Sequence, residues 1–338
     1  MDLQTLWFGL ITILFTGYFI LEGFDFGVGI LLPFLGKDNE SRRQLINTIG
    51  PHWDGNEVWL ITAGGAMFAA FPLWYATLFS GFYLALFLIL VALIIRGVAF
   101  EFRGKMTNPR WRSAWDGCIF FGSLIPALLW GVALTNLLQG VPIDGNLNYV
   151  GTFGDLLNPL SLLGGVVSLL GFTYHGALFL SLKTTAPMSA SARMAAYRLW
   201  IAVFISLTLY AVVLNFLTSI PSAAGLNPIV FSVLALLAVT GSGWLLRSGK
   251  NGWSFITGAL GIVFSSLTIF MALFPRVMVS SLAAANSLTI YNAASGAETL
   301  KIMTIVAAIF VPIVLVYQGW TYWVFRKRIS TKPEDLHY

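Results

Sequence analysis

The sequence predicts an all-α integral membrane protein with about nine transmembrane helices. Of its 338 residues, 57% are hydrophobic and only 10% are charged, whereas a soluble globular chain carries about 25% charged residues. The apolar residues also form long blocks, each of which reaches the roughly 20 residues that cross a hydrocarbon core. Because the backbone must satisfy its own hydrogen bonds in lipid, each block is expected to be a helix.

The charges of the loops predict how these helices are oriented. The expected helices are 6–34, 45–70, 77–100, 115–139, 160–182, 198–220, 228–246, 253–275 and 299–325. Lys and Arg gather in alternate loops and in the C-terminal tail, whereas the stretches 71–76, 140–158 and 221–227 hold none. The positive-inside rule then places the N-terminus outside and the C-terminus in the cytoplasm. An odd number of crossings requires the same arrangement.

The nine helices are expected to form two four-helix bundles and one C-terminal helix. Residues 1–140 would form a first bundle with buried charges, 141–275 a second bundle, and 276–338 the last helix with a basic cytoplasmic tail. A weak internal repeat favours this division, since polar residues interrupt the first apolar run of each bundle, at 22–25 and at 173–176. A chance match is the rival interpretation.

Acidic residues are concentrated in the first predicted bundle. No Asp or Glu occurs between Leu156 and Ala297, whereas the first four helices hold Glu22, Asp25, Asp54, Glu57, Glu101 and Asp116, with Arg96 among them. Each charge inside a membrane costs roughly 2.5–3.5 kcal/mol on insertion scales, so such a group indicates a purpose. The pairs Glu22/Asp25 and Asp54/Glu57 are spaced three apart, so each pair is expected on one helix face.

Two interpretations of these charges stay open. Arg96 could pair with Asp25 or Asp54 and simply lock the helices together. Alternatively the cluster moves protons or shapes a redox partner's site, which is favoured because carboxylates outnumber the one deep cation. In that case proton transfer is assigned to Asp25, Asp54 and Glu57, with Glu22, Arg96, Glu101 and Asp116 as supporting charges.

Several other kinds of site are excluded or disfavoured. Cys118 is the only cysteine, so the chain has neither an internal disulfide nor a thiolate metal cluster. His175 is the one deep histidine, and haem in a membrane bundle usually needs a strong axial ligand with a partner. We therefore expect His175 to be a hydrogen-bonded core residue and the chain to bind neither cofactor nor metal. No basic run carries interleaved aromatics, so nucleic-acid binding is not expected.

Three strings in the first third of the chain resemble subunit II of the cytochrome bd quinol oxidases. They are the strings EGFDFGVG at 22–29, GPHWDGNEVW at 50–59 and RGVAFEFR at 96–103, and the similarity continues through WDG at 115–117. The resemblance implies a subunit of a bacterial cytoplasmic-membrane oxidase that reduces dioxygen to water with electrons from quinol. It implies a partner, subunit I, that carries two b-type haems, one d-type haem and the quinol-oxidising loop, while this chain is haem-free and not catalytic alone.

The same resemblance suggests roles for individual residues. Asp25 and Asp54 match positions implicated in delivering cytoplasmic protons and in supporting insertion of haem d, and Glu57, Arg96 and Glu101 fall inside matching strings. Contacts with membrane lipid, a small single-helix accessory subunit and, as in some relatives, a structural quinone are compatible with it. The rival hypotheses are a stand-alone proton-coupled transporter and a purely structural scaffold subunit.

Overall fold

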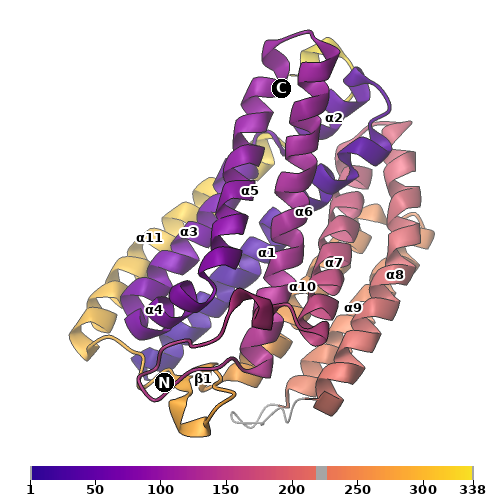
Figure 1. The fold of residues 1–338 in the computed structure, drawn as a ribbon. Helices are drawn as coiled ribbons and strands as arrows, with labels where there is room; N and C mark the ends of the chain where they lie inside the picture. The colour runs from indigo at the N-terminus through magenta and orange to yellow at the C-terminus, as the bar shows by residue number, and fades with distance from the viewer. Residues whose placement is uncertain (1, 218–226, 337–338) are drawn as a thin grey trace.

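The computed structural model describes residues 2–217 and 227–336, which form a bundle of long helices (Figure 1). The helices are α1 (Leu3–Leu35), α2 (Asn39–Ile49), α3 (Trp53–Ala70), α4 (Pro72–Gly81), α5 (Tyr83–Phe102), α6 (Pro109–Gln139), α7 (Pro159–Lys183), α8 (Met188–Leu217), α9 (Pro228–Arg247), α10 (Asn251–Leu273) and α11 (Ala297–Val324). Short 3-10 helices are η1 (Arg103–Lys105), η2 (Phe153–Leu156), η3 (Ala284–Asn286) and η4 (Pro333–Asp335). The first and last described residues lie at opposite ends of the bundle.

Eight helices of the described residues are long and apolar enough to cross a membrane. They confirm an all-α multi-pass membrane fold, while the number of crossings and their orientation stay predictions. Five of the predicted spans, 6–34, 160–182, 228–246, 253–275 and 299–325, lie within three residues of the observed helix ends. The predicted span 198–220 belongs to α8, which begins earlier, at Met188; its predicted end at 220 lies outside the described residues.

Two predicted spans are interrupted. The predicted helix 45–70 is divided into α2 and α3 at Gly50-Pro51, because proline removes a backbone donor and clashes with the preceding turn. The span predicted at 77–100 likewise divides into α4 and α5 next to Phe82. The α3 helix, which carries Asp54 and Glu57, is therefore only 18 residues long and is not one of the eight apolar spans.

The α1 helix is central and packs against α3, α6, α7 and α10. Gly27 of α1 and Gly176 of α7 meet where these helices cross, and a Cβ on either would collide with the backbone of the other. Gly23 lies one turn away against the ring of Phe172. Small residues on both helices therefore let α1 and α7 approach each other closely. Since α1 contacts helices of both halves, the division into two bundles stays a prediction.

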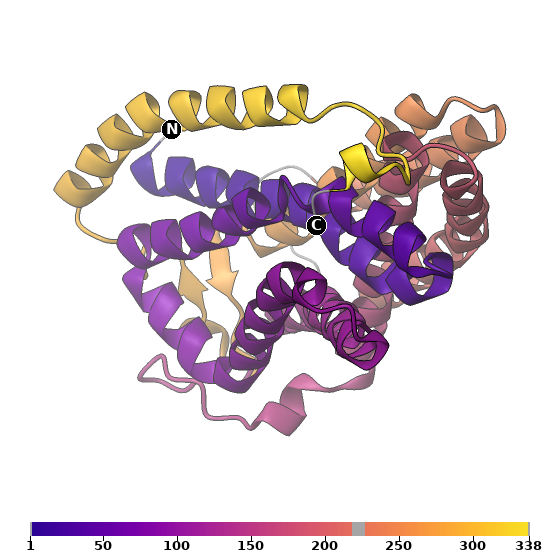
Figure 2. The same ribbon diagram turned by 90° about the horizontal axis from the view of Figure 1, so that it is seen from above.

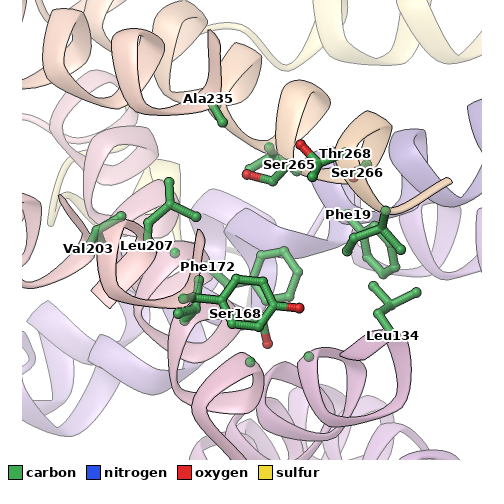
Figure 3. A pocket seen from close by; sticks show the side chains of 18 of the residues that line it. Phe19, Leu134, Ser168, Phe172, Val203, Leu207, Ala235, Ser265, Ser266 and Thr268 are labelled. Atoms are coloured by element: carbon green, nitrogen blue, oxygen red, sulfur yellow. The ribbon is translucent and has the colours of Figure 1, made fainter. Parts of the chain in front are cut away.

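A cavity of about 140 Å³ lies among α6, α7, α8, α9 and α10. Figure 3 shows hydroxyl side chains on two sides of it, with Ser168 from α7 opposite Ser265, Ser266 and Thr268 from α10. The rest of its wall is mainly apolar or aromatic, as at Phe172. No carboxylate is among the residues that line it.

The two ends of the bundle are closed by irregular segments. At the end where the N-terminus lies, a short antiparallel pair joins β1 (Arg276–Met278) to β2 (Leu288–Thr289). At the other end the chain after α11 crosses α2 and α7, where the Ile329 carbonyl accepts from the Gln44 side chain at 2.8 Å. Figure 2 shows α11 itself at the periphery, alongside α1.

Candidate functional site

Four charged residues meet where α1, α3 and α5 face one another, and we call Glu22, Asp25, Glu57 and Arg96 the acidic cluster. Arg96 on α5 is fully buried and donates through Nη2 to Glu22 and, at 2.7 Å, to Glu57. Glu22 and Asp25 on α1 are also fully buried, whereas the Glu57 side chain keeps 21% of its exposure. The spacing of three residues between Glu22 and Asp25 thus places both predicted acids of α1 on the same buried side of the helix.

Asp25 is held by a residue that no sequence pattern singles out, Asn56. Its Oδ2 accepts a hydrogen bond from Asn56 Nδ2 at 2.8 Å, and Asn56 Oδ1 accepts one from the Tyr322 hydroxyl at 2.8 Å. Gln318 Nε2 also approaches Asn56 Oδ1, at 3.4 Å. Gln318 and Tyr322 are four apart on the apolar helix α11, and this polar i, i+4 pair is the signal that could have identified them.

The acidic cluster leaves polar atoms without protein partners. Among the described residues none bonds to Asp25 Oδ1, Glu22 Oε2, Arg96 Nε or Arg96 Nη1, although all four atoms are buried. The guanidinium carbon of Arg96 lies 4.9 Å from the centroid of the Phe26 ring, a cation–π contact that offers no hydrogen bond. Buried polar atoms of this kind are usually satisfied by ordered water or by a proton shared between them.

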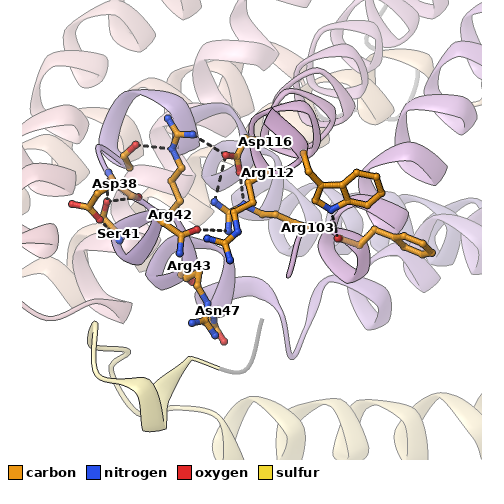
Figure 4. A network of polar contacts seen from close by, with 12 residues as sticks. Asp38, Ser41, Arg42, Arg43, Asn47, Arg103, Arg112 and Asp116 are labelled. Atoms are coloured by element: carbon orange, nitrogen blue, oxygen red, sulfur yellow. Dashed lines mark hydrogen bonds and ion pairs between the residues drawn. The ribbon is translucent and has the colours of Figure 1, made fainter. Parts of the chain in front are cut away.

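The predicted supporting charge Asp116 belongs to a different network (Figure 4). Its carboxylate accepts from Arg42 Nη1 at 2.8 Å and from Arg103 Nε at 2.5 Å. Arg103 also donates to Asn39 at 3.3 Å. These bonds tie α2, η1 and α6 together near the α2 end of the bundle, apart from Arg96.

Asp54 and Glu101 lie outside the acidic cluster within this chain. Both are exposed, and the Asp54 carboxylate accepts from the N–H of Gly55 at 2.7 Å. Asp54 occupies the first turn of α3, and at about 100° per residue its side chain lies on nearly the opposite side of the helix from the buried Asn56. In the interpretation that Arg96 locks the helices by pairing, the partners named from the sequence, Asp25 and Asp54, are wrong: Arg96 Nη2 bonds to Glu22 and Glu57 instead.

The two histidines of the described residues occupy separate places. His175 Nε2 lies 3.1 Å from the carbonyl oxygen of Ile20, and its ring stacks on Phe255 with centroids 4.7 Å apart. His52 lies at the α2–α3 break and stacks on Tyr322, with centroids 4.3 Å apart. Within the described ranges, His, Cys, Asp and Glu form no group that could hold a metal ion.

Comparison with known proteins places this arrangement in one family. A family model described as cytochrome bd terminal oxidase subunit II matches residues 3–325. The chain is 46% identical over 332 residues to the cytochrome bd ubiquinol oxidase subunit 2 of Bacillus subtilis (strain 168), with 98% of each chain covered. It is 40% identical over 370 residues to the cytochrome bd-I ubiquinol oxidase subunit 2 of Escherichia coli (strain K12), with 99% of this chain and 96% of that protein covered.

A solved structure confirms the fold. One chain of the bd oxidase from Geobacillus thermodenitrificans superposes with a TM-score of 0.76 at 21% identity, covering 97% of this chain and 100% of that one. A subunit II requires a subunit I as its partner, and the eight apolar helices fit a multi-pass protein of the bacterial cytoplasmic membrane. This chain belongs to the cytochrome bd terminal oxidase subunit II family, the second subunit of a quinol oxidase.

Proposed function

We propose that this chain is the haem-free partner of subunit I and that its acidic cluster delivers cytoplasmic protons for the reduction of dioxygen to water. The haems, two of b type and one of d type, and the oxidation of quinol belong to subunit I in this proposal. Support comes from the histidines, since His52 and His175 lie apart and each has an aromatic stacking partner.

The observation that carries the proposal is the charge balance of the acidic cluster. Glu22 and Glu57 bond to the single guanidinium of Arg96, and the third carboxylate, Asp25, is buried about one turn along α1 from Glu22. Full ionisation would leave two negative charges without a counter-charge in a nearly water-free interior, which is energetically costly. The cluster must therefore hold protons, and a group that holds protons beside unpartnered polar atoms can also exchange them through water.

In this proposal the exposed Asp54 is the point at which protons enter the acidic cluster. It lies three residues before Glu57 on α3. Glu57 is the member of the acidic cluster whose side chain is partly exposed. An exposed carboxylate facing lipid would cost roughly 2.5–3.5 kcal/mol, so we propose that subunit I and water cover this face of α3 in the complex. Protons would then pass from Asp54 to Glu57 and on to Glu22 and Asp25.

A structural role of the same residues is the second candidate, and one observation favours it. The bonds of Arg96 to Glu22 and Glu57 join α1, α3 and α5, so the charges also hold three helices in place. Supporting assembly and the haem d site would follow from this rigidity. The two roles differ in what happens when one carboxyl is made neutral at constant shape.

The test is to measure oxidase turnover and haem content in complexes that carry Asp54→Asn or Asp25→Asn. Asn keeps the size of the side chain but cannot carry a proton. Proton delivery predicts turnover lower by roughly a hundredfold or more with normal haem content, the scale of losing one acid–base group. Loss of haem d in an assembled complex would assign the residue to site shaping. Normal turnover, haem content and stability in both variants would contradict both roles.

A stand-alone proton-coupled transporter would use similar acids, and purification separates it from the oxidase. Haem absorbance that co-migrates with this chain after detergent extraction is expected for the complex. A colourless, monodisperse preparation of the native protein would favour transport instead. The same chain expressed alone is expected to show no stoichiometric haem in a redox difference spectrum.

A further inference from the structure

The position of Asp25 depends on the C-terminal helix α11. We infer that Tyr322 is a positioning residue: its hydroxyl fixes the orientation of the Asn56 amide and thereby the hydrogen bond that Asn56 donates to Asp25. This inference rests on the proposed role of Asp25 in holding and passing protons, and it identifies the residues that control that role from a helix outside the acidic cluster.

The contacts form one continuous path from α11 to α1. The Tyr322 hydroxyl donates to Asn56 Oδ1 at 2.8 Å, and Asn56 Nδ2 donates to Asp25 Oδ2 at 2.8 Å. Asn56 and Asp25 are buried. Asn56 Nδ2 also lies 3.4 Å from the carbonyl oxygen of Leu21, so both ends of the amide have suitable partners in this orientation alone.

An asparagine amide has a donor end and an acceptor end, and a rotation by half a turn exchanges them. If Asn56 turned over, its oxygen would face the oxygens of Asp25 and Leu21, and the hydrogen bond that this oxygen accepts from Tyr322 would be lost. The acceptors on α1 and the donors on α11 therefore favour the same orientation. Without the Tyr322 hydroxyl, Asn56 Oδ1 keeps only the longer contact from Gln318 Nε2, at 3.4 Å, among the described residues, so the hydrogen bond to Asp25 Oδ2 is held less firmly.

The aromatic ring of Tyr322 is itself held in place. His52 stacks on it nearly in parallel, with an interplanar angle of 8°. One turn earlier on α11, Gln318 Oε1 accepts from Trp59 Nε1 at 2.7 Å. His52 precedes Asn56 in the sequence and Trp59 follows it. Residues of α11 therefore contact the chain on both sides of the Asn56 amide.

The rest of α11 makes few buried contacts, so these polar bonds decide where its C-terminal part lies. Leu300 is the only residue of α11 that is buried. Near this residue the helix is fastened by Trp7 Nε1, which donates to the Leu300 carbonyl at 3.2 Å and to the Thr304 hydroxyl at 3.1 Å. At its far end, Lys183 donates to the carbonyl oxygen of Phe325. The Tyr322–Asn56 bond sits between these fastenings.

The experiment is Tyr322→Phe in the assembled oxidase complex, with Tyr317→Phe as the matched control. Tyr317 lies on the same helix and is 65% exposed, so its substitution removes the same atom from a surface site. We expect the infrared carbonyl band of Asp25, identified by its absence in Asp25→Asn, to move to higher frequency in Tyr322→Phe alone. Turnover should fall about fivefold at unchanged haem content, the scale of one buried hydrogen bond.

A second pair of variants tests whether Tyr322 acts through Asn56. In an Asn56→Ala background, Tyr322→Phe should lower turnover no further, because the amide that it orients is gone. Additive losses would overturn the inference. So would an unshifted Asp25 band in Tyr322→Phe, or a loss of haem and assembly in that variant, which would assign the hydroxyl to structure alone.

The outcomes also separate this inference from the proposed function. If Asp25→Asn retains full turnover, the proton role of Asp25 fails, yet a shifted Asp25 band in Tyr322→Phe would still establish the positioning contact. If Asp25→Asn is slow but Tyr322→Phe matches Tyr317→Phe in both band and turnover, the proton role stands and the positioning role is refuted.

Discussion

The first half of the molecule buries carboxylates and arginines together, whereas the described part of the second half, α7–α10, buries mainly neutral hydroxyls, with Lys183 at the end of α7 as a buried cation. In the second half the Tyr174 hydroxyl lies 2.7 Å from Ser242, whose own hydroxyl donates to the Ser254 carbonyl at 2.7 Å. Ser254 in turn donates to the Ser242 carbonyl at 2.8 Å, so each serine hydroxyl donates to the carbonyl oxygen of the other serine. The acidic cluster leaves several buried atoms unpartnered. Neutral pairs therefore hold helices together in the second half, and in our proposal the acidic cluster of the first half is the part that exchanges protons.

The largest expected effect comes from Arg96→Gln, which removes the only cation of the acidic cluster. Leaving buried carboxylates without their counter-charge costs about 3–5 kcal/mol. We expect little assembled complex, measured as haem per subunit II after purification. Adding Glu22→Gln should restore part of the assembly, since it removes one of the orphaned charges. A fully assembled Arg96→Gln complex would mean that the first half is no more dependent on charge than the second.

A smaller but substantial loss of stability is expected from Gly176→Val, because Gly176 lies where α7 of the second half crosses α1 of the first. The added side chain would enter the backbone of α1 at Gly27. Overpacking of this kind typically costs about 1–3 kcal/mol, and more where only backbone can give way, as here. Thermal unfolding of the purified complex measures it. Gly241→Val on α9, where a Cβ meets nothing within 4 Å, is the control. Equal melting temperatures in the two variants would show that the halves are not tightly joined.

The sequence predicts the membrane class and the acid-rich first half, because long apolar runs match the thickness of a bilayer and charges among them are too costly to be incidental. It also predicts one group of seven charges, of which four meet in the acidic cluster, whereas Asp54, Glu101 and Asp116 lie elsewhere. It does not predict that Asp54 faces outward, because which side of α3 is buried depends on how α3 packs against α1 and α11, and Asp54 lies on the side away from the buried Asn56. Asn56 and Tyr322 are missed because their contact joins residues 266 positions apart, which only the packing of α11 determines.

A modest effect on stability, with none on turnover, is expected from Tyr174→Phe in the second half. The substitution removes the hydroxyl that meets Ser242 and leaves the Ser242–Ser254 bonds in place. The cost should be about 1 kcal/mol, the usual net value of one hydrogen bond. Turnover and thermal stability, measured beside Tyr322→Phe, check the contrast between the halves. A slowed Tyr174→Phe complex with normal haem content would show that the hydroxyl group of the second half also serves the reaction.

The smallest effect is expected at the Asp116 network, where two arginines share one carboxylate. Arg42 keeps 29% of its side-chain exposure, so its pair with Asp116 is partly screened by water and is worth roughly 0–1 kcal/mol. Arg103 is buried and binds the same carboxylate through Nε, with Nη2 at 3.4 Å as a weaker second contact. Arg42→Gln should therefore leave stability nearly unchanged, whereas Arg103→Gln should lower it clearly because Asp116 stays buried without its main partner. Thermal unfolding at low and high salt separates the two, since salt weakens only the exposed pair. Equal losses in both variants would mean that water does not reach Arg42 in the assembled complex, and that subunit I or a lipid headgroup covers this end of α2.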